Sequence, residues 1–227
     1  MLILADARLP ERVLKNLGRY GQVVPFASQG VVYEAISGHP DIFLCQVPGG
    51  VVAAPNTPKN ILEALENKGT SLFFGKEPLG KAYPATARYN AFSGKDCLLH
   101  LFDLTDEVIL AQTQGLEKIA VRQGYARCSL VEAGRLYITS DRGIEKELKQ
   151  NCRETFYVDP SPIILPGQPH GFFGGCTGVW GQQLFLAGSL RHFPEGELLQ
   201  QALVQRGITI IELYDGPLWD GGSILFL

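Results

Sequence analysis

Thiol and imidazole side chains stand next to glycine-rich stretches of this 227-residue sequence. Cys128 and Cys176 each fall shortly before turn glycines, and His170 lies in "PGQPHGFFGG". A thiol that a histidine can deprotonate is a nucleophile, so these three residues are the candidate catalytic set. The alternative for each cysteine is a packed core thiol, because free cysteine is among the most buried residue types. The alternative for His170 is an ordinary loop histidine.

Carboxylates and a second histidine form another candidate group. Asp41 and Asp220 precede two apolar stretches that are expected to be strands. Two carboxylates gathered at one pore would favour a cationic ligand, although aspartate beside glycine or proline is also normal turn chemistry. His39, directly before Pro40, is either part of this group or a turn residue.

The stretch "VRQGYARC" at 121–128 adds Arg122, Gln123 and Tyr125 at the start of another expected strand. Its arginines would meet a carboxylate or phosphate ligand bidentately, or would instead pair with acidic neighbours. Asn90, alone in an apolar stretch, is a channel-facing hydrogen-bonding residue or marks a bulge.

The sequence predicts no metal site and no cofactor. It has five cysteines but no C-x-x-C pair, and its four histidines do not cluster with cysteines along the chain. "GGCTGVWG" is not a dinucleotide fingerprint, because it falls within a hairpin and not between a strand and a helix.

Composition excludes several classes of partner. A content of 45% hydrophobic and 19% charged residues is ordinary for a soluble globular protein, and a net charge of −3 argues against nucleic-acid binding. No apolar run approaches the roughly 20 residues that span a bilayer, and the stretch before Asp6 is too short for a signal-peptide core. We therefore expect a cytoplasmic protein with reduced thiols and no membrane partner.

Four stretches share one order of elements: two strands joined by a tight turn, a helix, and a closing strand. The copies occupy 41–74, 125–158, 171–213 and, more weakly, 85–121. The first 26 residues lack an opening strand, and "GSILFL" at 222–227 is an opening strand with no unit after it. These two pieces complete one another in a closed ring, so residues 223–227 are expected to pair with residues 2–5. The rival fold is an open α/β sheet, but simple strand–helix alternation does not predict a hairpin before every helix.

A ring of five ββαβ units resembles the pentein, or guanidine-modifying-enzyme, superfamily, which includes amidinotransferases and deiminases. The phrases "HPDIFLC", "VRQGYARCS", "PGQPHGFFGG" and "LWDGGSILFL" resemble an uncharacterised bacterial branch of it. The resemblance implies a single pentein-like domain over residues 1–227. It also implies a five-bladed α/β propeller whose reactive residues lie at the mouth of a central channel.

The resemblance breaks down at the family's nucleophile. The motif Gly-Gly-Gly-x-Ile-His-Cys is matched by Gly221, Gly222, Ser223 and Ile224, but Leu225 and Phe226 replace its histidine and cysteine. A second motif, His-x-Asp, is matched at His170 with Phe172 in the aspartate position. His39-Pro40-Asp41 has the same spacing in an earlier unit.

Three functions remain open. The first is binding of a small polar or cationic ligand, guanidine- or amidine-like, in the channel of a degenerate site. The second is a hydrolase or amidinotransferase acting on a guanidine-type C–N bond with a relocated Cys128 or Cys176 and His170. The third is a non-catalytic module that binds a protein partner. The expected ligand-binding residues are His39, Asp41, Asn90, Arg122, Gln123, Tyr125, Asp220 and Ser223.

Overall fold

The computed structural model describes all residues, 1–227, and contains five separate three-stranded sheets. Their strand orders are β15-β1-β2, β3-β4-β5, β6-β7-β8, β9-β10-β11 and β12-β13-β14. In every sheet the first two strands are antiparallel and the third is parallel to the second. The ββαβ order predicted from the sequence is therefore confirmed.

The strands are β1 (Leu2–Asp6), β2 (Gln22–Phe26), β3 (Leu44–Val47), β4 (Gly50–Ala53), β5 (Leu72–Phe74), β6 (Phe92–Ser93), β7 (Cys97–His100), β8 (Glu117–Ala120), β9 (Leu130–Ala133), β10 (Leu136–Thr139), β11 (Thr155–Tyr157), β12 (Thr177–Trp180), β13 (Gln183–Leu186), β14 (Thr209–Glu212) and β15 (Leu225–Phe226). The helices are α1 (Glu11–Leu17), α2 (Pro40–Phe43), α3 (Lys59–Asn67), α4 (Glu107–Gln112), α5 (Ala126–Ser129), α6 (Arg142–Gln150) and α7 (Gly196–Val204), with 3-10 turns η1 (Glu34–Ile36), η2 (Gly174–Cys176) and η3 (Leu190–His192).

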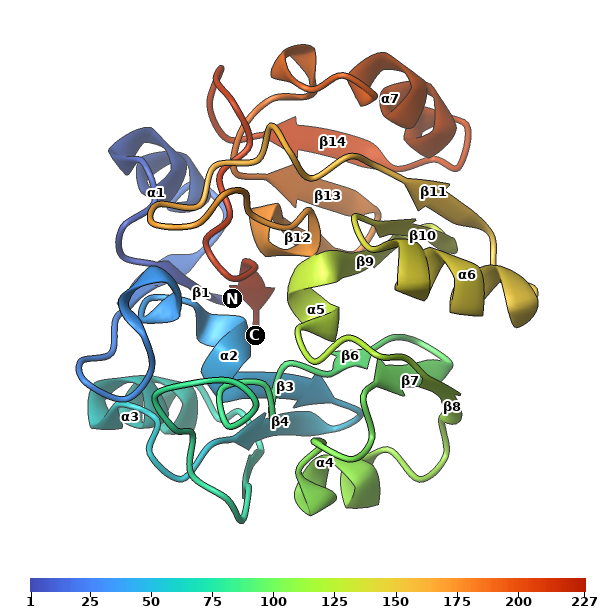
Figure 1. Cartoon of the computed structure of the whole chain (residues 1–227). Coiled ribbons are helices and arrows are strands. Elements are labelled where there is room, and N and C mark those ends of the chain that lie inside the picture. The colour runs from blue at the N-terminus through green and yellow to red at the C-terminus, as the bar shows by residue number, and fades with distance from the viewer.

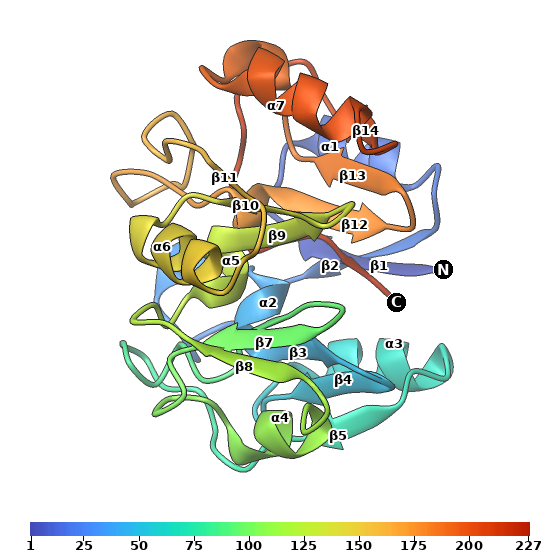
Figure 2. The same cartoon turned by 90° about the vertical axis from the view of Figure 1, so that its right-hand side faces the viewer.

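The five sheets follow one another around the centre of the molecule, with the longer helices on the outside (Figure 1). Seen from the side, the strands of successive sheets are stacked beside each other, and α2 and α5 lie between them near the middle (Figure 2). No helix of the chain combines the length and the apolar character that crossing a bilayer requires.

Three outer helices each bury two apolar residues that are four positions apart. The buried residues are Ile61 and Leu65 on α3, Ile144 and Leu148 on α6, and Leu199 and Leu203 on α7. A spacing of four residues places both side chains of a pair on one helix face, which packs on the sheet while the opposite face meets solvent. The spacing predicts α3 from the sequence, whereas α6 and α7 are predicted from their end signals, Asp141 for α6 and Pro194 and Gly207 for α7.

The last strand takes the place of an opening strand for the first unit. β15 is antiparallel to β1, with Ile3 opposite Phe226 and Leu4 opposite Leu225. The backbone amides and carbonyls of Leu2 and Leu227 also exchange two hydrogen bonds of 2.8 Å. The pairing covers an apolar edge of β1 that would otherwise be open to association, and it confirms the predicted contact between the two terminal segments.

Local details depart from the sequence predictions in three places. The stretch 85–92 was expected to be a strand, but only Phe92–Ser93 pairs. The predicted strand beginning at Asp41 begins instead at Leu44, because Pro40–Phe43 form the short helix α2 with proline in its first turn. The position of Thr57 before Pro58 predicts an N-cap for α3, but Thr57 does not cap it, since its hydroxyl donates to the carbonyl of Ala54.

Candidate functional site

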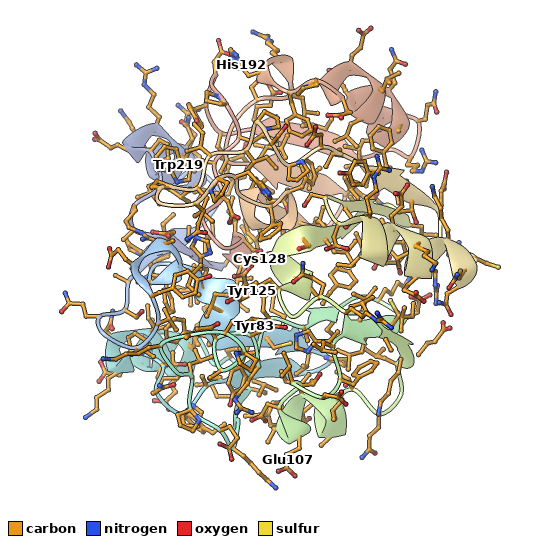
Figure 3. All side chains as sticks on the ribbon, viewed as in Figure 1. Tyr83, Glu107, Tyr125, Cys128, His192 and Trp219 are labelled. Atoms are coloured by element: carbon orange, nitrogen blue, oxygen red, sulfur yellow. The ribbon has the colours of Figure 1, made fainter.

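Short helical turns and loops bring one residue from each of three sheets to the centre. Asn90, Cys128 and Ser223 each lie two residues before the first residue of the opening strand of a sheet. These equivalent positions lie close together in the structure, so side chains far apart in the chain become neighbours. Figure 3 shows Cys128 near the middle of the molecule, with Tyr125 close by.

Asp41 is the hub of this cluster and is fully buried. The thiol of Cys128 lies 3.1 and 3.3 Å from the two carboxylate oxygens of Asp41, and the hydroxyl of Ser223 donates to the same carboxylate at 2.6 Å. The side-chain amide of Asn90 donates to the backbone carbonyl of Asp41 at 3.0 Å and to the Cys128 sulfur at 3.2 Å. The Asn90 oxygen in turn accepts the backbone N–H of Cys128 at 3.1 Å.

Asp220 is a second buried carboxylate, held by the backbone. It accepts the N–H groups of Phe172 at 2.8 Å and of Gly222 at 3.0 Å. Burial raises the pKa of its carboxyl, while the nearby imidazole of His39 acts in the opposite direction. Gly222 has a φ of +65°, and a Cβ there would collide with His39, so only glycine lets the backbone approach this closely.

His39 lies between two carboxylates without hydrogen-bonding to either. It is 1% exposed, with Nε2 3.8 Å from an Asp6 oxygen and Nδ1 3.9 Å from an Asp220 oxygen. Both distances exceed hydrogen-bond length, and neither ring nitrogen has another partner. Asp6 is already held by Arg8, whose guanidinium donates to both of its oxygens.

A cavity of about 250 Å³ opens onto this cluster. Three aromatic rings, Tyr33, Tyr125 and Phe172, form part of its wall. The Tyr33 hydroxyl donates to that of Tyr125 at 3.3 Å, and Tyr125 also hydrogen-bonds Thr86 at 2.6 Å. The full lining is Tyr33, Ile36, His39, Ile42, Tyr125, Cys128, Leu165, Gln168, Pro169, His170, Phe172 and Asp220, with no lysine or arginine. A larger hollow of about 540 Å³ around Arg153 is lined mainly by charged side chains, and Arg153 pairs there with Asp96.

The thiol facing this cavity is neutral. Burial raises the pKa of Cys128 well above its usual value, and the charges of Asp41 and Asp220 raise it further. A nucleophilic cysteine needs the opposite, a cationic neighbour or a helix N-terminus that stabilises the thiolate. The free protein therefore does not hold Cys128 as an activated nucleophile.

Five of the residues singled out in the sequence line the cavity: His39, Tyr125, Cys128, His170 and Asp220. Asp41, Asn90 and Ser223 lie directly behind its wall, in hydrogen-bond contact with Cys128 or with one another. His170 is half-buried, and its Nδ1 lies 2.9 Å from the carbonyl of Gly171.

Three other singled-out residues lie elsewhere. Arg122 is exposed, and Gln123 donates to Asp141 at 3.0 Å while accepting the Tyr125 N–H at 2.9 Å. Cys176 is fully buried and its thiol donates to the carbonyl of Phe172 at 3.3 Å. None of the three lines the cavity.

Asp6, Tyr33 and Gln168 were not predicted as site residues from the sequence. Tyr33 and Gln168 belong to loops, where no periodic pattern shows which side chain points inward. Asp6 ends β1, and its spacing from Arg8 was the available signal, because the partly exposed guanidinium of Arg8 donates to the buried Asp6 carboxylate as a fork.

Leu225 and Phe226, which replace the histidine and cysteine of the pentein motif, belong to the core. Leu225 and Phe226 are 1% and 5% exposed, and the Phe226 ring centroid lies 4.6 Å from that of Phe185. Neither residue lines the cavity. Their side chains stabilise the pairing of β15 with the first sheet.

Solved structures with a similar arrangement include three guanidine-modifying proteins. One is agmatine deiminase from C. jejuni, a cysteine-to-serine mutant with substrate bound (TM-score 0.55, 11% identity, covering 96% of this chain and 90% of that one). Another is a mutant DDAH from Pseudomonas aeruginosa complexed with citrulline (TM-score 0.52, 8% identity, covering 93% of this chain and 91% of that one). A third is SxtG, an amidinotransferase from Microseira wollei in the saxitoxin biosynthetic pathway (TM-score 0.53, 9% identity, covering 93% of this chain and 87% of that one). At these identities the likeness shows the pentein fold and nothing finer.

A comparison with curated proteins gives no significant match. The sequence does match one protein family, over residues 4–225. The chain, which has the fold of the pentein superfamily, belongs to the family of unknown function DUF6873.

Proposed function

We propose that this protein binds a small cationic ligand of the guanidine or amidine type in the cavity that Asp220 and Cys128 line. The observation that carries the proposal is the charge of the cavity. A buried carboxylate, Asp220, faces it and Asp41 lies behind Cys128, whereas no lysine or arginine is among its lining residues. A planar cation would gain from these carboxylates and from the faces of Tyr33, Tyr125 and Phe172.

The size of the cavity supports a small ligand. About 250 Å³ is near the lower end of ligand pockets. His170 and Gln168, on the same loop, add polar groups at its rim. The solved structures with this fold include proteins bound to citrulline and to an agmatine deiminase substrate. That likeness supports the ligand class only coarsely.

Thermal stability measures the proposed binding directly. Arginine, agmatine and dimethylarginine should raise the melting temperature, whereas citrulline, which has the shape of arginine without its cationic group, should act far less. A ligand at 100 times its Kd stabilises by about 2.7 kcal/mol, which corresponds to a shift of roughly 5–10 °C for a chain of this size. Equal shifts with arginine and citrulline would contradict a charge-selective cavity.

Asp220→Asn tests the residue that carries the proposal. Loss of a buried charge that pairs with the ligand should weaken binding by about 2–5 kcal/mol. Asp215→Asn is the matched control, because Asp215 is exposed and pairs only with His192. Affinity that is unchanged in Asp220→Asn would place the ligand elsewhere.

A second candidate function is hydrolysis or amidino transfer at a guanidine C–N bond. The observation in its favour is that Cys128 and His170 line one cavity. Against it stands the raised pKa of the Cys128 thiol. Incubation with the same three guanidines, with ureido product and ammonia measured, should show no turnover above a denatured control. Turnover that Cys128→Ser abolishes would replace binding by catalysis as the function.

We also infer that the five sheets are the blades of one closed α/β propeller over residues 1–227, a single pentein-like domain. The shared strand order of the sheets and the pairing of β15 with β1 support this arrangement. Its centre is then the channel whose mouth forms the cavity.

A further inference from the structure

A buried histidine without a hydrogen-bond partner is unusual enough to need an explanation. His39 is 1% exposed, and both of its ring nitrogens lack a partner. A buried polar atom that is left unpaired has lost its hydrogen bonds to water without replacement, which is destabilising, and most such groups in native proteins are satisfied. A group that binds the ring nitrogen would remove this cost.

Two further ligand-type atoms lie beside His39. A ring nitrogen of His39, a carboxylate oxygen of Asp41 and the sulfur of Cys128 are all within 4.8 Å of one another, and all three residues are buried. Nitrogen, oxygen and sulfur at such separations are the donor set that zinc and similar divalent transition metals take. A tetrahedral zinc site places its ligand atoms roughly 3.4–3.6 Å apart, so the most distant pair would have to approach by up to about 1.3 Å on binding.

The neighbouring residues orient two of these three ligands. Ser223 donates to the Asp41 carboxylate at 2.6 Å, and Asn90 fixes the backbone N–H of Cys128 at 3.1 Å. Hydrogen bonds of this kind hold metal ligands in place and raise affinity. His39 and Cys128 also line the cavity, so a fourth coordination position would face it.

We propose that His39, Asp41 and Cys128 form a binding site for a divalent transition metal of the zinc type, with an open fourth position toward the cavity. On binding, the Cys128 sulfur loses its proton to solvent and the thiolate bonds the metal. His39 directly precedes α2 and Asp41 belongs to α2, so the tertiary fold has only to place Cys128 on α5 beside them.

The metal site does not depend on the proposed binding of a guanidine. The metal ion and the guanidinium ion would compete for the same cavity. A divalent cation next to Asp220 would repel a guanidinium ion in the same cavity. Metal-loaded protein should therefore bind agmatine more weakly than protein treated with a chelator. By reciprocity, agmatine should weaken metal binding by the same factor.

Cobalt(II) is a suitable probe, because a thiolate ligand produces a sulfur-to-cobalt charge-transfer absorption. Reduced, chelator-treated protein is titrated with Co²⁺ and the spectrum and stoichiometry are recorded. We expect one ion per chain and a charge-transfer band that Zn²⁺ abolishes by displacement. A titration of the wild type that produces no such band overturns the proposal.

Variants assign the ligands. Cys128→Ser should remove the band, and His39→Gln should reduce affinity by more than the roughly 10- to 100-fold typical of losing a supporting hydrogen bond. Cys152→Ser and His192→Gln are matched controls, because Cys152 and His192 are exposed, and both should bind as the wild type does. A band that persists in Cys128→Ser, or disappears in Cys152→Ser, contradicts the proposed site.

Two outcomes separate this proposal from the proposed function. If agmatine stabilises the wild-type protein but no cobalt band appears, the cation-binding proposal stands and the metal-site proposal is wrong. If the protein binds cobalt but not agmatine, the metal-site proposal stands and the cation-binding proposal is wrong.

Discussion

The sulfur of Cys128 lies 3.1 Å from a carboxylate oxygen of Asp41, a residue 87 positions earlier in the chain. The thiol is the donor in this contact and the carboxylate the acceptor, so the interaction stabilises the neutral thiol. Asp220 adds a second negative charge nearby. These contacts keep the sulfur of Cys128 protonated next to a small cavity, which has measurable effects on its reactivity.

The first prediction concerns thiol reactivity. At neutral pH an alkylating agent should modify Cys152 first, because it is the one exposed cysteine, and should modify Cys128 slowly. Burial and neighbouring carboxylates keep Cys128 protonated, and only the thiolate reacts. Peptide mapping by mass spectrometry after timed alkylation gives both rates. Rapid modification of Cys128 would indicate an activated nucleophile.

The second prediction concerns the carboxylate that holds the thiol. Asp41→Asn, in a Cys152→Ser background, should shift the alkylation of Cys128 to lower pH. Burial remains the largest cause of the raised pKa, but the negative charge of Asp41, the next largest, disappears. The pH dependence of the alkylation rate measures this shift. Asp103→Asn, at an exposed aspartate, is the control and should leave the profile unchanged.

The third prediction separates a hydrogen bond from backbone conformation at Ser223. This buried residue has a φ of +68°, and its hydroxyl donates to Asp41 at 2.6 Å. Ser223→Ala removes only the hydrogen bond and should lower the free energy of unfolding by about 1–3 kcal/mol. Ser223→Gly also removes the steric cost of a left-handed residue, about 1–2 kcal/mol. Urea denaturation should therefore find the glycine variant the more stable of the two, and the reverse order would exclude backbone strain at this position.

The fourth prediction concerns acid stability. His100 is buried, its ring nitrogens bond Thr105 at 2.7 Å and the carbonyl of Gly124 at 2.8 Å, and burial lowers its pKa to about 4. The unfolded chain binds this proton near pH 6.5 and the folded chain only near pH 4. The contribution to stability is complete above pH 6.5 and is lost as the pH falls toward 4. Linkage gives about 2–4 kcal/mol for a shift of this size.

His100→Gln should flatten that part of the pH profile. Chemical denaturation at several pH values between 7 and 4 compares the variant with the wild type. The aspartates titrate in the same way in both proteins, so the difference between the two curves isolates His100. Parallel curves would show that His100 is not held neutral by the fold.

The fifth prediction concerns the closing strand. Phe226→Ala should lower the free energy of unfolding by about 3–5 kcal/mol, because its ring packs on Phe185 and is 5% exposed. Trp180→Ala is the control within the same aromatic group, because Trp180 is 48% exposed and should cost far less. Equal losses in denaturation experiments would contradict a core position for Phe226.

The repeated order of elements was predictable because it depends on local pattern. The pairs Ile61 and Leu65, or Ile144 and Leu148, mark a helix face by spacing alone. Asp141 caps its helix by accepting the N–H of Ile144 at 2.8 Å, as its position before the helix indicates. The contact between the two terminal segments was also predictable. The first unit lacks an opening strand, and the last segment is an opening strand with no unit after it.

The membership of the site was only partly predictable. Asp41, Cys128 and Asp220 were identified by residue type, but Arg122 and Gln123, in the same phrase as Tyr125, point away from the cavity. In an irregular stretch the direction of each side chain depends on individual backbone angles, and these depend on contacts with distant segments. The helical turn of α2 that aims Asp41 at Cys128 is one such case.

The sequence by itself determined the local elements, their fivefold repetition and the loss of the usual nucleophile, because propensity, spacing and residue identity are properties of short segments. Only the tertiary structure decided that Asp41, Asn90, Cys128 and Ser223 form one hydrogen-bonded cluster. It also left His39 unpaired beside them. The physical reason is that these contacts join segments separated by tens to hundreds of residues, and their geometry follows from how the sheets pack around a shared centre.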